Sequence, residues 1–368
     1  MRPTWAEIDL DAIGHNTEAL ARASGTRLCS IVKADAYGHG AVPASRATLD
    51  AGAEMLGVAL IDEGIRLRQA GIRAPILLLS EPRPSEMIQA CEYDLDPTVY
   101  SGEGVAAASA AAGQQGRSIG VHLKVDTGMR RVGTEVELAP AVAESIQNRE
   151  HIELASVWTH CAVADWPDDP LTDTQIERFD AALAEIEARG VEVRRAHIGN
   201  SAVALAHPTG RRDMVRSGIA LYGIEPDEGL SGEVELKPAM RLVSEVSFVK
   251  RVPAGTSVSY GQAWTSDRDT TLATVPIGYA DGVRRSSGQL GVEVLLGAKR
   301  CPIVGNVTMD QLLIDCGPES DVVAGQEVVL LGSQGDEEIT ANEVAARLGT
   351  IGYEVVCDVG PRVRRRYR

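Results

Sequence analysis

The sequence lacks any apolar run long enough to cross a lipid bilayer, which takes about 20 residues. Residues 1–5 lead into a polar stretch and do not form a secretory signal. The six cysteines are scattered and form no Cys-x-x-Cys pair, which is a common spacing of zinc ligands. Together these absences indicate a reducing compartment and no structural zinc. We therefore expect a cytoplasmic protein that has no membrane partner and binds no metal.

Basic residues are scarce relative to acidic ones. The chain has 36 Lys and Arg against 52 Asp and Glu, and its formal net charge is −16. This excess of negative charge disfavours nucleic acids and anionic membranes as partners. A short basic run ends the chain, and we expect it to be a solvated terminus. It contains Arg362, Arg364, Arg365, Arg366 and Arg368.

Apolar runs and alanine-rich helical stretches alternate through the first part of the 368-residue chain, beginning with a helix that Asp11 could cap. Such alternation predicts parallel strands joined by right-handed helical crossovers. Eight successive units predict a (β/α)8, or TIM, barrel. The predicted strands are residues 28–32, 56–60, 75–79, 95–99, 119–125, 154–159, 194–198 and 213–215.

The pattern changes after Pro226. Residues 233–238 form a polar stretch that contains a proline, which indicates a domain boundary. Short β-rich runs with turn signals follow, interrupted by one helix between Thr340, which begins a capping box, and Gly349. We therefore predict a barrel in residues 1–235 and a mostly β domain in residues 236–368, and residues 1–10 could pair with the β domain.

Active sites of such barrels form at the C-terminal ends of the strands. The loops after the seventh and eighth strands often bind phosphate, so Ser201 and Gly218 are candidates for an anion site. Polar or basic residues occupy five strand ends, namely Lys33, Lys124, His160, the pair Asn200 and Ser201, and Arg216 followed by Gly218 and Ile219.

Lys33 can be interpreted in two ways. A lysine at the end of an apolar strand is partly desolvated, which favours the neutral amine that condenses with an aldehyde. It can equally be a surface lysine whose aliphatic stem lies along the strand. The polar, glycine-rich segment that follows it, which holds Tyr37 and His39, favours the first interpretation.

The segment Val-Lys-Ala-Asp-Ala-Tyr-Gly-His-Gly at residues 32–40 resembles the lysine motif of alanine racemases, which use pyridoxal 5'-phosphate. The resemblance extends along nearly the whole chain. It implies that Lys33 holds the cofactor through its aldehyde and that Tyr37 contacts the cofactor phosphate. It also implies a homodimer with shared active sites, in which each β domain contributes to the site of the partner.

Further segments resemble the family one by one. Lys-Val-Asp-Thr-Gly-Met-Arg-Arg at residues 124–131 implies a carbamylated Lys124 that orients a substrate-binding Arg131. From the residues alone, Lys124 could instead form an ion pair with Asp126. Val-Ser-Tyr-Gly at residues 258–261 implies that Tyr260 is a catalytic base. The other matching segments imply cofactor contacts from His160, Asn200, Ser201, Arg216, Gly218, Ile219 and Tyr353, and substrate contacts from Tyr279 and Met309.

Two qualifications come from the residues themselves. Taken alone, His160 would be a core histidine, and the tyrosines would be core or edge residues of a β domain. Thr308 departs from the family pattern, because many members have cysteine before the methionine. The contact attributed to that loop comes largely from the backbone, so we expect activity to survive the change.

The set of residues is chemically coherent. Removing the α-proton of an amino acid needs an electron sink, and racemisation needs an acid–base group on each face of the planar carbanion. The resemblance implies that Lys33 and Tyr260 serve the two faces of alanine, so that the enzyme supplies D-alanine for peptidoglycan. Three alternatives are a broader-specificity (serine) racemase, a decarboxylase of similar architecture and a non-catalytic pyridoxal-phosphate-binding protein. The resemblance places Arg216 at the pyridine nitrogen of the cofactor, where such decarboxylases have a carboxylate, and this argues against the decarboxylase. The non-catalytic proteins resemble the barrel alone, so the β domain argues against them.

Overall fold

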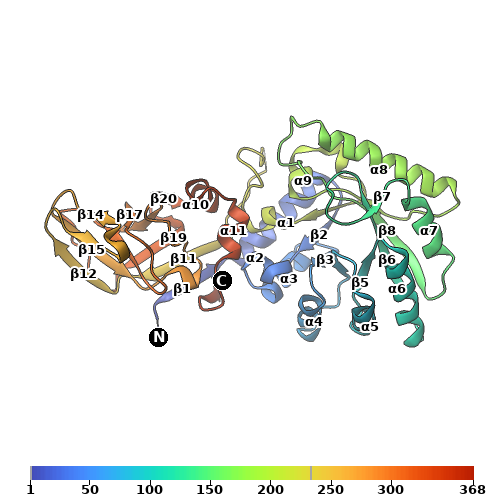
Figure 1. The fold of residues 1–368 in the computed structure, drawn as a ribbon, viewed down its shortest axis with the longest axis horizontal. Coiled ribbons are helices and arrows are strands. Elements are labelled where there is room, and N and C mark those ends of the chain that lie inside the picture. The colour runs from blue at the N-terminus through green and yellow to red at the C-terminus, as the bar shows by residue number, and fades with distance from the viewer. Residues whose placement is uncertain (1, 233) are drawn as a thin grey trace. The chain divides into compact units, whose positions relative to one another are not determined.

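A computed structural model describes residues 2–232 and 234–368, which form two compact units (Figure 1). The barrel unit comprises Ile13–Ala36 and Ala41–Leu236. The β unit comprises Met1–Ala12, Tyr37–Gly40 and Lys237–Arg368. Glu233, the first residue of the predicted boundary stretch, lies outside the described residues. The boundary of independently folding domains at residues 235 and 236 stays a prediction.

Eight parallel strands form the wall of the barrel unit, as the sequence predicted. They pair in the order β10-β2-β3-β4-β5-β6-β8-β9, and a short strand, β7 (Thr134–Glu135), pairs with β6. Backbone hydrogen bonds join the two ends of this order, from Asp213 N to Ala196 O at 3.1 Å and from Arg216 N to Gly199 O at 2.8 Å. The strands are β2 (Arg27–Ile31), β3 (Met55–Val58), β4 (Ile76–Leu78), β5 (Asp96–Val99), β6 (Ile119–Asp126), β8 (Ile152–Trp158), β9 (Ala196–His197) and β10 (Met214–Ser217).

Helices alternate with these strands and pack their apolar faces against them, which builds a core that includes Leu123, Val157 and Phe179 (Figure 1). The first helix begins earlier than predicted, because Asp9 Oδ1 accepts the Ala12 N–H at 2.9 Å and Asp11 lies inside the helix. The helices are α1 (Leu10–Ser24), α3 (Ala41–Asp50), α4 (Ile61–Gln69), α5 (Pro84–Glu92), α6 (Gly102–Gln114), α7 (Ala139–Gln147), α8 (Leu171–Ala188) and α9 (Ser201–Ala206).

The β unit consists mainly of one mixed sheet in the order β12-β15-β18-β17-β16-β19-β11-β1-β21, with β20 (Glu337–Ile339) on β19. The small pair β13 (Ser257–Val258) and β14 (Trp264–Thr265) is separate. The strands of the sheet are β1 (Thr4–Ile8), β11 (Met240–Glu245), β12 (Phe248–Val252), β15 (Thr270–Val275), β16 (Glu293–Leu296), β17 (Arg300–Val304), β18 (Leu312–Asp315), β19 (Glu327–Gln334) and β21 (Arg364–Tyr367).

The basic tail is solvated as predicted, with Arg362, Arg364, Arg366 and Arg368 exposed, but it also forms a strand, which was not predicted. Its strand β21 pairs in parallel with β1 and is an edge strand of the sheet. Arg365 donates to the carbonyls of Gly38, Gly360 and Val363 at 2.9, 2.6 and 2.7 Å. Arg366 lies over the Trp5 ring at 3.9 Å. The arginines supply backbone partners and packed aliphatic stems to the sheet, and a charge count cannot reveal this role.

Two helices complete the β unit. The predicted one is α10 (Ala341–Leu348), which Thr340 caps by accepting the Glu343 N–H at 3.0 Å and Gly349 ends with φ 68°. The sequence did not predict α11 (Gly352–Cys357), whose six residues are too few for a clear period. Among the helices of the described residues, none is long and apolar enough to cross a membrane.

Candidate active site

Lys33 follows β2 at the C-terminal end of the barrel wall and is half-buried. The polar, glycine-rich segment after it begins with one left-handed turn. Ala34, Asp35 and Ala36 have φ of 52°, 54° and 55°, a region that residues with a side chain rarely adopt. Each such residue costs on the order of 1–2 kcal/mol, so the surroundings must hold the turn in place.

Glu63 on α4 provides that support. Its Oε1 accepts the Ala34 N–H at 2.6 Å, while Oε2 accepts those of Ala59 and Leu60 at 2.9 and 3.0 Å. The side chain is buried, with 7% of the residue exposed, so these bonds act in a desolvated setting. Glu63 thereby joins the turn after Lys33 to the end of the neighbouring strand. Glu63 was not predicted as part of the site, because an acidic residue in the first turn of a helix is common.

Arg216 on β10 is the most completely buried charge among the candidate residues, with 3% of the residue exposed. Its guanidinium donates to Nδ1 of His197 at 2.9 Å and to Nδ1 of His160 at 3.1 Å. It also donates to the carbonyls of Thr159 and Ile198 at 2.7 and 2.8 Å. Acceptors from two neighbouring strand ends therefore fix the plane of the guanidinium.

Burial shifts the pKa values of Arg216, His160 and His197 and so sets their protonation states. Burial lowers the pKa of Arg216 to about 10, so the guanidinium keeps its charge at neutral pH. Burial, reinforced by the charge of Arg216, holds the pKa of His160 and of His197 well below the usual range. Both imidazoles are therefore neutral and can accept from Arg216.

A hydrogen-bonded chain continues behind His197. Because Nδ1 of His197 accepts from the arginine, its Nε2 carries the proton and donates to Ser156 Oγ at 2.9 Å. The hydroxyl of Ser156 then donates to Nδ1 of His122 at 2.6 Å. Burial lowers the pKa of His122 to about 3, so this ring is also neutral. The sequence analysis identified none of these three residues as part of the site.

Lys124 on β6 is buried beside the aromatic face of Trp158, with Nζ 4.4 Å from the ring centroid. Burial lowers the pKa of Lys124 to about 7, and the charges of Arg216 and Arg131 act in the same direction. No ion pair joins Lys124 to Asp126 among the described residues. Asp126 Oδ1 instead accepts the N–H groups of Gly128 and Arg130 at 2.9 and 3.0 Å. Lys124 is thus a buried amine that is partly neutral at physiological pH.

Gln175 on α8 fixes the segment that carries His160. Its Nε2 donates to the His160 carbonyl at 3.0 Å and to Thr127 Oγ1 at 3.1 Å, while its Oε1 accepts the Ala162 N–H at 2.8 Å. Gln175 is fully buried and links the loops after β6 and β8. It was not predicted, because the sequence of α8 reads as an ordinary amphipathic helix.

The two candidate phosphate loops lie next to each other. Ser201 Oγ accepts the Gly218 N–H at 2.9 Å, and Asn200 Oδ1 caps α9 by accepting the Val203 N–H at 3.0 Å. Ser217 Oγ is buried and has no hydrogen-bond partner among the residues that the structure describes. A buried hydroxyl without a partner is costly, and an anion would satisfy it.

In the β unit, Tyr37 and Tyr353 lie together, with ring centroids 6.1 Å apart. Burial raises the pKa of Tyr37 above its usual value, so its phenol stays protonated at neutral pH. A protonated phenol is a hydrogen-bond donor, which suits an anionic ligand. The structure therefore brings together the two tyrosines for which the sequence predicts the same role.

Tyr260 lies in a tight turn after β13, and 72% of the residue is exposed. Ser259 and Gly261 flank it with φ of 67° and 70°. Asn306 holds this turn by donating to the Tyr260 carbonyl at 2.8 Å, and the Asn306 carbonyl accepts from Ser259 Oγ at 2.6 Å. Sequence reasoning missed Asn306, since nothing at its position indicates a long-range partner.

Tyr279 and Met309 lie on two adjacent loops of the β unit, and both are exposed. The Tyr279 N–H donates to the Thr308 carbonyl at 2.9 Å, and the Ala280 N–H donates to the Met309 carbonyl at 3.1 Å. Thr308 Oγ1 donates to the Gln311 carbonyl at 2.8 Å. The hydroxyl that replaces the usual cysteine thus closes its own loop.

Within the barrel unit, the charges of Lys33, Arg131 and Arg216 act on both Lys124 and His160, so these residues belong to one electrostatic environment. Comparisons with known proteins show the family to which both units belong. The model of the alanine racemase N-terminal domain matches residues 8–226, and that of the alanine racemase C-terminal domain matches residues 239–367. The chain belongs to the alanine racemase family.

Individual members of the alanine racemase family match over the full length. The alanine racemase of Symbiobacterium thermophilum is 45% identical over 369 residues, which cover 100% of this chain and 97% of that protein. The enzyme of Desulfovibrio desulfuricans is 43% identical over 100% of this chain and 98% of its own. A non-catalytic pyridoxal-phosphate-binding protein would consist of the barrel alone. Because both domains of this chain match, the comparisons disfavour that alternative.

Solved structures of the family show the same fold. The alanine racemase of a D-cycloserine-producing Streptomyces lavendulae superposes with a TM-score of 0.94 at 39% identity, covering 100% of this chain and 97% of that one. The alanine racemase of Bacillus anthracis with bound L-Ala-P superposes with a TM-score of 0.93 at 38% identity, covering 100% and 95%.

The substitution Glu63→Gln tests the support of the turn after Lys33. Glutamine keeps one acceptor oxygen, so Ala34 or the pair Ala59 and Leu60 loses its partner, and we expect a loss of about 1–3 kcal/mol in unfolding free energy. Chemical denaturation measures it. Asp62→Asn, at the exposed neighbouring position, is the control and should change stability by less than about 0.5 kcal/mol. Equal stability of the two variants would show that Glu63 does not hold the turn.

Proposed function

We infer that this chain is an alanine racemase, an isomerase that interconverts L-alanine and D-alanine. The observation that carries the inference is the buried, charged Arg216, held by His160 and His197 in a chain that has both family domains. Most pyridoxal-phosphate enzymes place a carboxylate at the pyridine nitrogen. Supply of D-alanine to peptidoglycan is the role that this activity serves in the family.

We propose that pyridoxal 5'-phosphate binds in this protein, and its chemistry fits the residues present. An anionic phosphate suits the partnerless Ser217 hydroxyl and the adjoining loops of Ser201 and Gly218. When bound, the cofactor withdraws electrons from the α-carbon of the amino acid attached to it. The residues proposed to hold it are Lys33, Tyr37, His160, Asn200, Ser201, Arg216, Gly218, Ile219 and Tyr353.

Arg216 shapes the chemistry through its protonation state. Even the lowered pKa of Arg216, about 10, lies above neutral pH, so the guanidinium keeps its proton and would act as a hydrogen-bond donor toward the pyridine ring of the cofactor. Because Arg216 keeps its proton, it would leave the ring nitrogen unprotonated, and this would favour return of the proton to the α-carbon over side reactions such as transamination. Neutral His160 and His197 hold the guanidinium in position throughout.

Lys33 and Tyr260 are the proposed catalytic residues. Lys33 moves a proton on one face of the α-carbon and Tyr260 on the other, because one tethered group rarely reaches both faces. Arg131 and the backbone of Met309 are proposed to bind the substrate carboxylate, with Tyr279 beside them. The exposed position of Tyr260, on a turn fixed by Asn306, suits contact with a second molecule.

We propose that the enzyme is a homodimer in which the β domain of one copy completes the barrel site of the other. The exposed Tyr260, Tyr279 and Met309 support this arrangement, since three large side chains of one unit face outward. We also propose a cytoplasmic location, because no cysteine of the described part of the chain is in a disulfide.

The activity is tested on the purified protein with pyridoxal 5'-phosphate and L-alanine. Circular dichroism should decay to zero as equal amounts of the isomers form, and L-serine should react far more slowly. Lys33→Ala should lose at least about a thousandfold in rate, within the range for removal of a covalent catalyst. Wild-type protein that holds the cofactor but leaves L-alanine unchanged would exclude the proposed function.

We propose that Lys124 is carbamylated. Its neutral amine adds to carbon dioxide, a nitrogen–carbon bond forms, and the proton leaves to solvent, so that a cation facing Arg131 becomes an anion that the guanidinium can bind. With labelled bicarbonate, NMR should show a carbamate signal that Lys124→Ala lacks and Lys250→Ala, an exposed control, retains. Because the pKa of Lys124 is lowered to about 7, the protonated amine dominates at lower pH, and the signal should fall there. A signal that persists in Lys124→Ala would contradict the assignment.

Shared sites predict complementation between two inactive variants. Lys33→Ala lacks the barrel catalyst and Tyr260→Ala lacks that of the β domain, so a mixed dimer holds one intact site out of two. After subunit exchange, verified by mass spectrometry, about a quarter of the wild-type activity should return in an equal mixture, since half the dimers are mixed. Two different Lys33 variants form the matched control and should recover nothing. Absence of recovery under verified exchange would mean that each chain builds its own site.

A further inference from the structure

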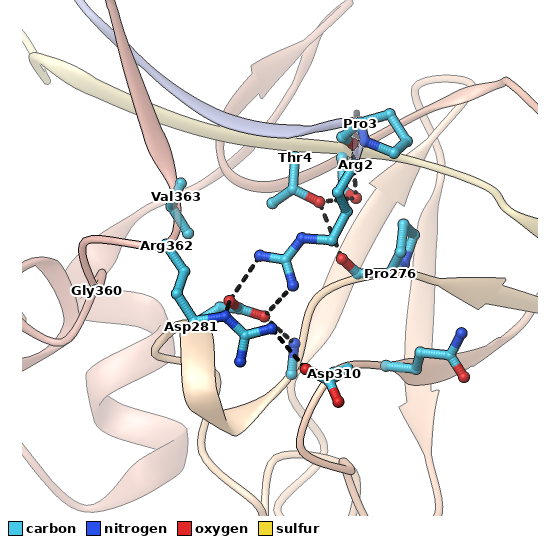
Figure 2. Close-up of polar contacts among 12 residues, drawn as sticks. Arg2, Pro3, Thr4, Pro276, Asp281, Asp310, Gly360, Arg362 and Val363 are labelled. Carbon is cyan, nitrogen blue, oxygen red and sulfur yellow. Dashed lines mark hydrogen bonds and ion pairs between the residues drawn. The ribbon is translucent and has the colours of Figure 1, made fainter.

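Asp281 is a fully buried aspartate in the β unit that joins both ends of the chain (Figure 2). Arg2 binds it with both terminal nitrogens, NH1 to Oδ2 at 2.9 Å and NH2 to Oδ1 at 2.6 Å. Arg362 approaches from the C-terminal segment, with Nε 3.4 Å from Oδ1. Two arginines that are 360 positions apart thus share one carboxylate. Such a group tolerates burial only while it is paired.

The same carboxylate closes the turn that carries Tyr279. Oδ2 of Asp281 accepts the Gly278 N–H at 2.9 Å, so this hydrogen bond joins the first and last residues of the turn. The Gly360 N–H donates to the Asp281 carbonyl at 3.1 Å, which adds a bond from the segment that precedes Arg362. The position of Tyr279 therefore depends on a side chain two residues away that does not face the solvent.

Arg362 also binds the loop that carries Met309. Arg362 NH2 lies 2.6 Å from Oδ1 of Asp310, the residue that follows Met309 (Figure 2). The two loops are in close backbone contact, because a Cβ at Gly278 would lie 2.3 Å from the Thr308 carbonyl oxygen. One arginine therefore bridges the aspartates of both loops.

We propose that Arg2, Asp281 and Arg362 form a clamp that positions Tyr279 and Met309 for the substrate. The proposal rests on the proposed function for the roles of those two residues. The clamp members are positioning residues, since they act behind the loops while Tyr279 and Met309 stay 44% and 52% exposed. Loosening the clamp should weaken binding of the alanine carboxylate and leave unchanged the attachment of the cofactor to Lys33, which belongs to the barrel unit.

The clamp is tested with Arg2→Gln, Arg362→Gln and the double variant, compared with Arg300→Gln. Arg300 also binds several acidic groups of the β unit, including Glu337 and Glu343, but contacts neither loop. Each single variant leaves Asp281 one arginine, so we expect KM for both alanine isomers to rise about threefold, with kcat within about twofold. The double variant should exceed the product of the singles, about tenfold or more, because the two share a partner. Arg362→Lys should recover part of the loss.

Hydrogen exchange separates this proposal from the proposed function. In the double variant, peptides that cover residues 278–283 and 306–311 should exchange faster, while the Lys33 peptide and the cofactor absorbance stay as in wild type. If wild type racemises alanine but the double variant matches Arg300→Gln in KM and exchange, the clamp is wrong and the function stands. If wild type does not racemise, the function fails, and faster exchange at the two loops alone still decides the clamp.

A second, independent feature of the β unit is a pair of cysteines on neighbouring strands. Ile303 of β17 pairs with Ile314 of β18, and the register continued by two residues places Cys301 opposite Cys316. The Cys316 N–H donates to the Thr271 carbonyl at 2.9 Å, so β18 keeps its pairing with β15 up to this residue. Sγ of Cys316 donates to the Ile314 carbonyl at 3.9 Å, and the Cys301 side chain opposite it is buried.

We propose that Cys301 and Cys316 form a reversible disulfide when a hydroperoxide oxidises them. Directly opposite residues of antiparallel strands have Cα atoms about 4.5–5.5 Å apart, within the range of disulfides. A thiolate attacks the peroxide oxygen, which leaves sulfenic acid on sulfur and releases an alcohol or water. The second thiol then attacks that sulfur and releases water, so two electrons pass to the peroxide.

The electrostatics of the pair support this chemistry. The neighbouring Cys316 thiol lowers the pKa of the Cys301 thiol, so Cys301 provides the thiolate. Cys316 is half-buried and gives solvent access to the pair, whereas Cys29 and Cys91 are buried and have raised pKa values.

Hydrogen peroxide treatment of the whole enzyme, followed by peptide mapping, tests the proposal. The expected product is a disulfide between Cys301 and Cys316 that dithiothreitol reverses. Cys301→Ser and Cys316→Ser should each abolish it, and Cys91→Ser should retain it at the wild-type rate. Absence of this disulfide at peroxide doses that oxidise other cysteines would overturn the proposal, as would a disulfide between other positions.

Discussion

The buried charge of Arg216 is the constraint on which the rest of the barrel site depends. A guanidinium at this depth is tolerated only because neutral imidazoles and strand-end carbonyls accept its hydrogen bonds. Burial lowers the pKa of His160 and His197, and the charge of Arg216 adds to this shift, so both rings stay neutral. The protonation states of one arginine and two histidines are therefore a single linked arrangement.

The charge of Arg216 also acts on Lys124. Burial lowers the pKa of Lys124, and the charge of Arg216 contributes to the same shift. An amine beside two arginines either loses its proton or gains a negative substituent, and both outcomes relieve the repulsion. The β unit also contains a buried charge, that of Asp281, which is stabilised by ion pairs with Arg2 and Arg362. In both units a desolvated charge fixes the loops that carry the candidate catalytic or substrate-binding side chains.

Periodicity predicted the fold well, since all eight predicted barrel strands are present and their ends carry Lys33, Lys124 and Arg216. What it missed are contacts between distant residues. The left-handed turn after Lys33 could not be expected, because residues with a side chain rarely adopt it and its cause is Glu63, a helix residue 29 positions away. The basic tail likewise became strand β21 through pairing with β1, which a local pattern cannot reveal.

The central claim is that Lys33 and Tyr260 act on opposite faces of the α-carbon. Single-turnover exchange of the α-hydrogen with deuterated solvent tests it, measured separately for L-alanine and D-alanine in wild type and Tyr260→Phe. The account predicts that Tyr260→Phe slows exchange from L-alanine at least about a hundredfold more than from D-alanine, if Tyr260 takes the L-isomer proton as the resemblance to alanine racemases implies. Equal slowing for both isomers would contradict it and indicate one base that serves both faces.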